Sequence, residues 1–510
     1  MINKEESRLP IILNIVFSVL GLLLNIGINM ILTPFITNNV GVAAYGFISL
    51  ANTIVGYIEI ISIALNSLAS RYMAIEYHNK DYIKANKIYN SVLISDIILS
   101  IIIFLGSILY IKNLEYFLNI PKSLLSDVRI LFYLVVFNYI LLTISTCFNV
   151  AVFIKNRLDL SSAVKNISYL IKAITLYVIF SIFSPHIWQV MIATIISTLF
   201  ILILNIYFTK KLTPKLKINP KKFSIKIVKE ITLNGIWNSI SSLGVMLNSG
   251  LDLLITNMFL NAIAMGQLSI SKNFAAIFNN FVSVFTQAFR PTQLKAYCMG
   301  DFKKLINEFN ISMKITASFC SIVFAGMVSL GYAFLNIWVP KQDITLIYNI
   351  LLIILIGDVI GSITYPLTYT FIIVNKLKIP SLINIFNGII NVLSMLFLLK
   401  FTELGLYAIV ITTAFLNIII QFLIIPPLSC RYLGLSKKTF YPTTFRCIIN
   451  CIFLTLIFSI IRIYFRNIDS WIKLIYSAAI LGVIGIIISY FILFTSYERK
   501  QLLKKIKNKL

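Results

Sequence analysis

The sequence places ionisable and amide side chains inside runs that are otherwise apolar. Glu59 lies near the middle of one such run, and Asn52 and Asn66 lie seven residues to either side of it. Seven residues are nearly two helical turns, so the three side chains should stack along one face of a helix. Within a bilayer, a carboxylate flanked by amides can bind a proton or a cation and can hydrogen-bond hydroxyl groups.

A second polar stripe repeats this spacing. Lys272, Asn279 and Thr286 are again seven residues apart. Asn273, Asn280 and Gln287 lie one position round the helix. A charge facing lipid costs about 2.5 to 3.5 kcal/mol on insertion scales, so both stripes should face protein or a water-filled cavity. Other ionisable residues inside apolar runs are Asp96, Lys172, Asp252 and Asp358. Asp96, close to a run end, is best explained as a tie between helices.

Enzyme signatures are missing from the sequence. It contains no Walker loop, no G-x-S-x-G elbow and no H-E-x-x-H motif, and no soluble insertion long enough to hold an active site. His78 and His186 fall on opposite sides of the expected membrane, which argues against a His-based metal site. The six cysteines have no paired spacing and read as small apolar residues. The residues therefore predict a protein that is not an enzyme.

The elements that must hold these residues are membrane helices. Apolar residues make up 59% of the 510 residues and charged residues 12%, about half the usual charged share. Runs long enough to span a bilayer recur along the whole chain, and they are too long and too continuous for β-barrel strands. We expect an all-α polytopic protein with about fourteen spans, at residues 11–36, 43–70, 89–111, 128–153, 164–183, 186–208, 231–257, 263–289, 312–335, 345–373, 379–399, 405–428, 443–464 and 471–495.

The basic residues indicate the orientation. With a cytoplasmic N-terminus, 34 of the 44 Lys and Arg residues fall in cytoplasmic segments and only 8 in outer ones. This asymmetry predicts that both termini are cytoplasmic. The net charge of +26 then reflects orientation and attraction to anionic lipids, and nucleic-acid binding is not expected from basic residues scattered over short loops.

An internal repeat divides the chain. A shift of 220 residues aligns Ala44, Gly46, Ser49, Tyr77, Asp81, Lys84 and Asn90 with Ala264, Gly266, Ser269, Tyr297, Asp301, Lys304 and Asn310. The shift covers six spans, so both copies should enter the membrane in the same direction. We therefore expect two pseudo-symmetric six-helix lobes, at residues 1–208 and 231–428. A basic cytoplasmic linker (209–230) joins them, and residues 429–510 form two further helices and a basic tail, expected as a surface-lying helix.

These patterns resemble a known family of transporters. The second span, "YGFISLANTIVGYIEI", is followed by "DYIKANKIYN", and its echo "MGQLSISKNFAAIFNNF" leads into "FRPTQLKAYCMGDFKKLINEFN". In this and in its six, six and two spans, the chain is similar to the Wzx-type polysaccharide flippases of the multidrug/oligosaccharidyl-lipid/polysaccharide (MOP) exporter superfamily, with a MATE-like fold. The resemblance implies a bacterial cytoplasmic-membrane protein that moves undecaprenyl-diphosphate-linked oligosaccharide to the outer leaflet by alternating access.

The resemblance also implies roles for the polar residues. Lys272, with Lys172 and Arg290, would meet the diphosphate. Asn52, Asn66, Asn273 and Asn280 would meet sugar hydroxyls. Glu59, Asp252 and Asp358 would hold a coupling ion, H⁺ or Na⁺, and no other cofactor is expected. Expected partners are the lipid-linked glycan, anionic lipids, and the glycan polymerase and glycosyltransferases of the same process.

Two other functions stay open. A multidrug or cation antiporter of the same superfamily would also use a central acid. A non-transporting scaffold for envelope assembly would use the same polar residues only to tie helices together. An interior packed with apolar side chains, with Glu59 paired to Lys272, would favour the scaffold.

Overall fold

The computed structural model describes residues 8–465, 467–496 and 498–499. Every expected span falls mainly on helical segments, and four of them are divided among two or three consecutive segments. Twelve helices of this described part are long and apolar enough to cross a membrane. The bent pair α9 (Ile225–Ser249) and α10 (Asp252–Phe259), with an angle of 41°, brings the number to thirteen if it forms one span. No strand occurs among the described residues, so the predicted all-helical membrane fold is confirmed.

The difference from fourteen spans lies in α11 (Ala262–Cys298). This helix has 37 residues, long enough to span a bilayer, but it is not among the candidate spans. The reason is its polar stripe, because Lys272 and several Asn and Gln residues lower the mean hydropathy of this helix. A helix of this composition is stable in a membrane only if its polar face is covered by protein or water.

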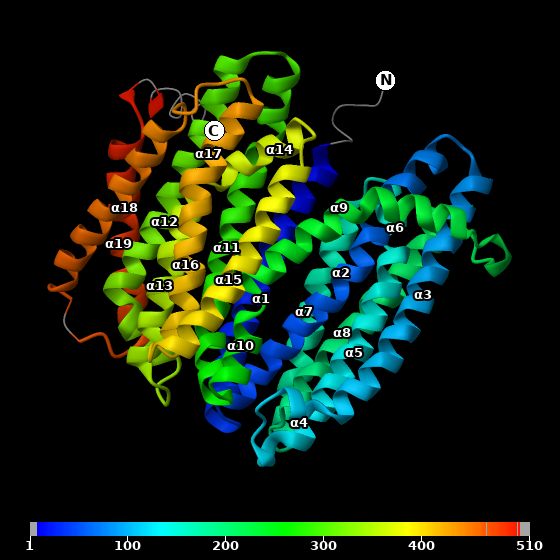
Figure 1. The fold of residues 1–510 in the computed structure, drawn as a ribbon, viewed down its shortest axis with the longest axis horizontal. Coiled ribbons are helices and arrows are strands. Elements are labelled where there is room, and N and C mark those ends of the chain that lie inside the picture. The colour runs from blue at the N-terminus through cyan, green and yellow to red at the C-terminus, as the bar shows by residue number, and fades with distance from the viewer. Residues whose placement is uncertain (1–7, 466, 497, 500–510) are drawn as a thin grey trace. The chain divides into compact units, whose positions relative to one another are not determined.

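The helices form two compact units. Unit 1 comprises Met1–Gly266 and Ser381–Gly388. Its elements are α1 (Arg8–Asn39), α2 (Val42–His78), α3 (Tyr82–Lys112), α4 (Leu114–Phe117), the 3₁₀ turn η1 (Lys122–Leu124), α5 (Leu125–Phe148), α6 (Val150–Ile154), α7 (Leu158–Ile182), α8 (Ile187–Leu212), the 3₁₀ turn η2 (Pro220–Lys222), α9 and α10. Figure 1 shows α3, α5 and α8 side by side, and α2 packs against α3, α5 and α9.

Unit 2 comprises Gln267–Pro380 and Ile389–Leu510. Its elements are most of α11, α12 (Phe302–Trp338), α13 (Ile344–Thr364), the 3₁₀ turn η3 (Tyr365–Thr368), α14 (Tyr369–Ile373), most of α15 (Lys378–Phe401), α16 (Leu406–Ile419), the π turn η4 (Ile420–Ile424), α17 (Ile425–Tyr432), α18 (Tyr441–Arg462) and α19 (Trp471–Leu493). Helix α12 is central and packs against α13, α18 and α19 (Figure 1). The lobe boundaries given by the repeat stay a prediction.

The repeat is visible in local geometry. Helices α2 and α11 both have 37 residues, and each is followed by an aspartate that caps the next helix. The Asp81 carboxylate accepts a hydrogen bond of 2.9 Å from the backbone N–H of Lys84, and Asp301 accepts one of the same length from Lys304. Such caps satisfy a free N–H at a helix start. The two halves thus begin their third helices in the same way.

Two glycines of the repeat touch each other. A Cβ added to Gly46 would lie 2.9 Å from the Cα of Gly266, and a Cβ on Gly266 would lie 2.1 Å from the carbonyl oxygen of Val42. Both residues belong to unit 1. The starts of α2 and α11 therefore approach so closely that only glycine fits, as in small-residue contacts between membrane helices.

We expect Gly266→Val to destabilise the protein by about 1–3 kcal/mol, because the added side chain overlaps the backbone of α2. Thermal unfolding of the purified protein in detergent measures the effect as a lower midpoint. Gly106→Val on α3 is the matched control, since nothing lies within 4 Å of a Cβ placed there. Equal midpoints for the two variants would show that the contact is not tight.

A buried ion pair fixes the segment after α19. The Lys314 ammonium, on α12 and only 5% exposed, lies 2.6 and 2.8 Å from the two carboxylate oxygens of Glu498. Burial raises the pKa of the Glu498 carboxyl, but hydrogen bonds from Lys314 and Thr495 outweigh it, so this pKa lies below its ordinary value. The predicted surface helix of the basic tail falls mainly on Lys500–Leu510, outside the described residues.

This pair predicts a pH-dependent stability. A depressed carboxyl pKa stabilises the fold above the ordinary value of 4.5, and that stabilisation is lost as the pH falls below it. Wild type should therefore unfold at a higher temperature than Glu498→Gln at pH 7, and the difference should shrink in acid. Glu403→Gln, at an exposed loop residue, is the control. A difference between wild type and Glu498→Gln that is unchanged across the acid range would contradict the role of this carboxylate.

Candidate functional site

Glu59 lines an open cavity between two helices of unit 1. The cavity has a volume of about 300 Å³, and α2 and α9 provide its walls. Besides Glu59, its polar lining consists of Ser241 and Ser242 on α9, and the other residues are Gly56, Ile60, Ile63, Val245 and Met246. The Glu59 side chain is exposed rather than buried between helices. An accessible carboxylate that shares a cavity with two hydroxyls has the groups needed to bind a proton or a cation.

Hydrogen bonds join α2 to α9 along their length, and we call this contact the α2–α9 seam. The Asn238 amide donates to the Ser67 hydroxyl at 3.0 Å, and the Asn234 amide donates to the Tyr72 hydroxyl at 3.0 Å. The Ser239 hydroxyl donates to the carbonyl of Ile60 at 2.8 Å. Such bonds between membrane helices are worth about 0.6 kcal/mol each on average. The seam is thus specific in register.

The amides of the first stripe are bonded to protein. The Asn66 amide donates to the carboxylate of Asp96 on α3 at 3.0 Å, and Asp96 is fully buried. The Asn52 amide donates to the carbonyl of Ile48 in its own helix at 3.0 Å. Asp96 is therefore a tie between helices, as its position predicts. Of the three residues of the stripe, Glu59 is the one that lines the cavity.

In unit 2, the second stripe meets an acid on α13. The Asn279 amide donates to the carboxylate of Asp358 at 2.9 Å, and Lys272 lies close enough to Asp358 to interact with it electrostatically. The side chain of Asn280 is exposed, and that of Asn273 is half-buried. Lys272, Asn279 and Asp358 form a polar cluster between α11 and α13.

The repeat exchanges the acid and the amide. Under the shift of 220 residues, Glu59 on α2 corresponds to Asn279 on α11, and Asn138 on α5 corresponds to Asp358 on α13. The first half therefore carries its acid on the second helix of the repeat, and the second half carries it on the fourth. Each half therefore has one acid and one amide at these two repeat positions.

The remaining predicted residues lie elsewhere. Arg290 on α11 stacks on the ring of Tyr369, with 5.2 Å between its guanidinium carbon and the ring centre. Lys172 lies on α7, half-buried, in unit 1. Asp252 is 4% exposed and begins α10. Among the described residues, no three His, Cys, Asp or Glu side chains gather as metal ligands.

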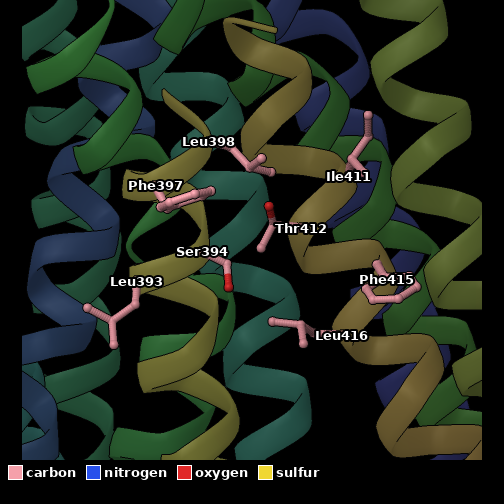
Figure 2. Close-up of a pocket in the computed structure, with 8 residues that line it drawn as sticks. All are labelled: Leu393, Ser394, Phe397, Leu398, Ile411, Thr412, Phe415 and Leu416. Carbon is pink, nitrogen blue, oxygen red and sulfur yellow. The ribbon is translucent and has the colours of Figure 1, made fainter. Parts of the chain in front are cut away.

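An apolar groove in unit 2 contains none of the predicted residues. Its volume is about 560 Å³, and it is lined by Leu393, Ser394, Phe397, Leu398, Ile411, Thr412, Phe415 and Leu416. Figure 2 shows these side chains on α15 and α16, with Leu398, Thr412 and Leu416 between the two helices. The Thr412 hydroxyl donates to the carbonyl of Ala408, so its polarity is satisfied within the helix. The groove therefore suits a hydrocarbon chain.

Comparisons with known proteins agree with this architecture. A model of the polysaccharide biosynthesis protein family matches residues 11–295. The Bacillus subtilis (strain 168) membrane protein EpsK is 27% identical over 489 residues, which are 95% of this chain and 96% of that protein.

Two solved structures share the fold. An inward-facing multidrug resistance MATE family transporter of the MOP superfamily has a TM-score of 0.67 at 14% identity, over 83% of this chain and 98% of its own. The lipid II flippase MurJ, in an inward closed conformation, has a TM-score of 0.67 at 15% identity, over 94% of this chain and 98% of its own. Of these two, the flippase covers more of the chain described here.

Proposed function

Because the chain belongs to the polysaccharide biosynthesis protein family and is a multi-pass membrane transporter with the MOP-type flippase fold, we propose that it flips a lipid-linked oligosaccharide. The cargo is a glycan on undecaprenyl diphosphate, carried from the cytoplasmic to the outer leaflet of a bacterial cytoplasmic membrane. The main support for the proposal is the cavity around Glu59. In this cavity an accessible carboxylate and two hydroxyls lie between two apolar helices.

The chemistry of the cargo suits the polar residues. A diphosphate needs cations and hydrogen-bond donors, and sugar hydroxyls need amides and other hydroxyls. Lys272 is our first candidate for the diphosphate, because it lies in the polar cluster of unit 2 beside Asp358. Lys172 and Arg290 are further candidates. Arg290 stacks on Tyr369, and binding of an anion would draw its guanidinium from that ring.

The candidate amides lie on two helices. Asn280 on α11 is exposed and could meet sugar hydroxyls directly, and Asn273 on the same helix is half-buried and a further candidate. Asn52 and Asn66 hold other partners in this conformation, the carbonyl of Ile48 and the carboxylate of Asp96. They would meet the cargo only after these bonds exchange. Exchange of this kind is expected in a protein that alternates between two conformations.

We propose that Glu59, Asp358 and Asp252 bind the coupling ion, H⁺ or Na⁺. Each is a carboxylate within or at the end of an apolar helix, where an uncompensated charge is costly. Binding a cation at one face of the membrane and releasing it at the other would therefore bias the protein between its conformations. No other cofactor is part of the proposal.

The apolar groove supplies a place for the lipid tail. It lies between α15 and α16 and is lined almost wholly by hydrocarbon side chains (Figure 2). A polyprenyl chain could rest there while the polar head crosses between the lobes. The glycan polymerase and the glycosyltransferases of the same process are proposed partners, since they would use and supply this cargo.

A multidrug or cation antiporter is the second candidate. The multidrug transporter structure has the same TM-score as the lipid II flippase, and a central acid serves both functions. A scaffold that transports nothing is the third. Neighbouring genes for glycosyltransferases and a polymerase would favour the flippase, whereas a drug-responsive regulator beside an isolated gene would favour the antiporter.

Deletion of the gene tests the proposal in cells. We expect surface glycan to disappear and the polyprenyl-linked oligosaccharide to accumulate in the membrane, because its synthesis continues without export. Re-expression of the protein should restore both. Normal surface glycan together with greater sensitivity to cationic drugs would contradict the flippase and support the antiporter.

A further inference from the structure

The basic linker that follows α8 is an ordered element. Residues 213–224, which we call the strap, connect the end of α8 at Leu212 to the start of α9 at Ile225. The strap contains four lysines and no acidic residue: Lys215, Lys217, Lys221 and Lys222. Lysines in a loop can serve membrane orientation alone, and that purpose does not require a fixed conformation.

Two asparagines of α3 hold the strap extended. The Asn86 amide donates to the carbonyl of Lys215 at 2.7 Å, and its oxygen accepts from the N–H of Lys217 at 2.7 Å. One turn later, the Asn90 amide donates to the carbonyl of Lys217 at 2.9 Å, and its oxygen accepts from the N–H of Asn219 at 2.6 Å. Both asparagine side chains are buried.

The hydrogen bonds from Asn86 and Asn90, which we call the clamp, fit the strap because the repeat distances of the two segments match. Four residues of a helix rise about 6 Å. Two residues of an extended chain rise about 6.6 Å, and their backbone groups point to the same side. Asn86 and Asn90 can therefore bind alternate residues of the strap as a neighbouring β-strand would. The Ser91 hydroxyl adds a bond from the N–H of Ser224 at 2.9 Å, and Leu216 is buried in the apolar cluster that includes Ile88 and Tyr89.

The clamp determines what the strap presents to its surroundings. With Leu216 turned inward, Lys215, Lys217 and Lys221 are exposed. Large apolar side chains are exposed beside them, with Ile218 at 61%, Phe223 at 36% and Ile225 at 70%. Because the strap joins two membrane helices and is only twelve residues long, it must lie near the membrane surface. Cations next to exposed apolar side chains are typical of segments that bind at the lipid interface.

We propose that the strap is a binding surface for the headgroups of anionic phospholipids. The lysines would meet lipid phosphates, while Ile218 and Phe223 enter the boundary between headgroups and acyl chains. The clamp from Asn86, Asn90 and Ser91 fixes the lysines in advance, so binding needs little further ordering of the backbone. This surface lies outside the polar sites of the transport proposal and can be tested without any transport assay.

The test uses the full-length protein purified in a neutral detergent. Native mass spectrometry measures binding of phosphatidylglycerol and of phosphatidylcholine. We expect phosphatidylglycerol to bind more tightly, and K215Q/K217Q/K221Q/K222Q to lower its affinity by about tenfold or more while leaving phosphatidylcholine unchanged. The matched control K112Q/K122Q/K341Q/K400Q removes four exposed lysines elsewhere and should bind phosphatidylglycerol like wild type. Equal affinity of wild type and the strap variant for phosphatidylglycerol would overturn the proposal.

Two further variants test whether phosphatidylglycerol binding requires the ordered strap or only its positive charge. N86A/N90A keeps every lysine but releases the clamp, and it should also weaken phosphatidylglycerol binding. Full affinity in a well-folded N86A/N90A protein would show that scattered charge suffices and would refute the role of the strap. If that variant does not purify as a single species, I218S/F223S tests the apolar contacts with the clamp intact, and unchanged affinity there counts against the proposal.

Millimolar inorganic phosphate should not displace the lipid; displacement would indicate a site for free phosphate instead.

Discussion

Glu59→Gln is expected to abolish transport while leaving the amount of protein in the membrane unchanged. Glutamine keeps the size of the side chain and its hydrogen-bonding capacity but cannot exchange a proton or attract a cation. The cavity between α2 and α9 would remain, with Ser241 and Ser242 in place. Restoration of surface glycan in cells that lack the gene measures the effect.

Glu76→Gln is the matched control for Glu59→Gln. Glu76 lies on the same helix but near its end, where it forms an ion pair of 2.5 Å with Lys84 of α3. Loss of a pair that is partly exposed costs little, so Glu76→Gln should restore glycan like wild type. Full glycan export by Glu59→Gln, at a normal protein level, would show that the carboxylate does not take part in transport.

A reversible cross-link across the α2–α9 seam should stop transport completely. In S67C/N238C, the two thiols replace side chains whose hydrogen-bonding atoms lie 3.0 Å apart. If the seam separates during alternating access, joining these residues with a short bis-thiosulfonate reagent traps one conformation. Reduction of the linker should restore activity. Cys298→Ser is a suitable background, because Cys298 is exposed and the other five cysteines are buried.

The control for the cross-link joins residues that need not separate. Glu115 of α4 and Arg129 of α5 form an ion pair of 3.4 Å inside the first predicted lobe, and both side chains are accessible. E115C/R129C, treated in the same way, should remain active. A cross-linked S67C/N238C protein that still transports at the wild-type rate would show that the α2–α9 seam stays closed throughout the cycle.

The helix that carries these polar residues could be predicted from the sequence, but their partners could not. The apolar run that contains Asn52, Glu59 and Asn66 correctly indicates one helix. Glu59 nevertheless faces a cavity, while Asn66 binds Asp96 on the neighbouring helix. Which neighbour a residue meets depends on how adjacent helices rotate against each other, and a periodicity within one helix carries no information on that rotation.

Two features of the structure could not be predicted from the sequence for a different reason. The groove between α15 and α16 arises from the packing of side chains that all look alike in an apolar run, such as Leu393 and Phe415. The strap follows from hydrogen bonds between Asn86 or Asn90 and a segment more than 120 residues later. The sequence indicates the lysines as a basic linker and Asn90 as part of the repeat. No pattern within either segment predicts that the two segments form hydrogen bonds with each other.

The most direct test of the account is leaflet exchange by the purified protein. Full-length protein is reconstituted in vesicles with a fluorescent polyprenyl-diphosphate-linked oligosaccharide, and a quencher outside the vesicles reports how fast the label crosses. We predict exchange well above that of protein-free vesicles, faster with a proton or sodium gradient, and reduced by Glu59→Gln to the protein-free rate. Exchange no faster than in protein-free vesicles, with and without either gradient, would contradict the claim that the polar interior carries a lipid-linked glycan.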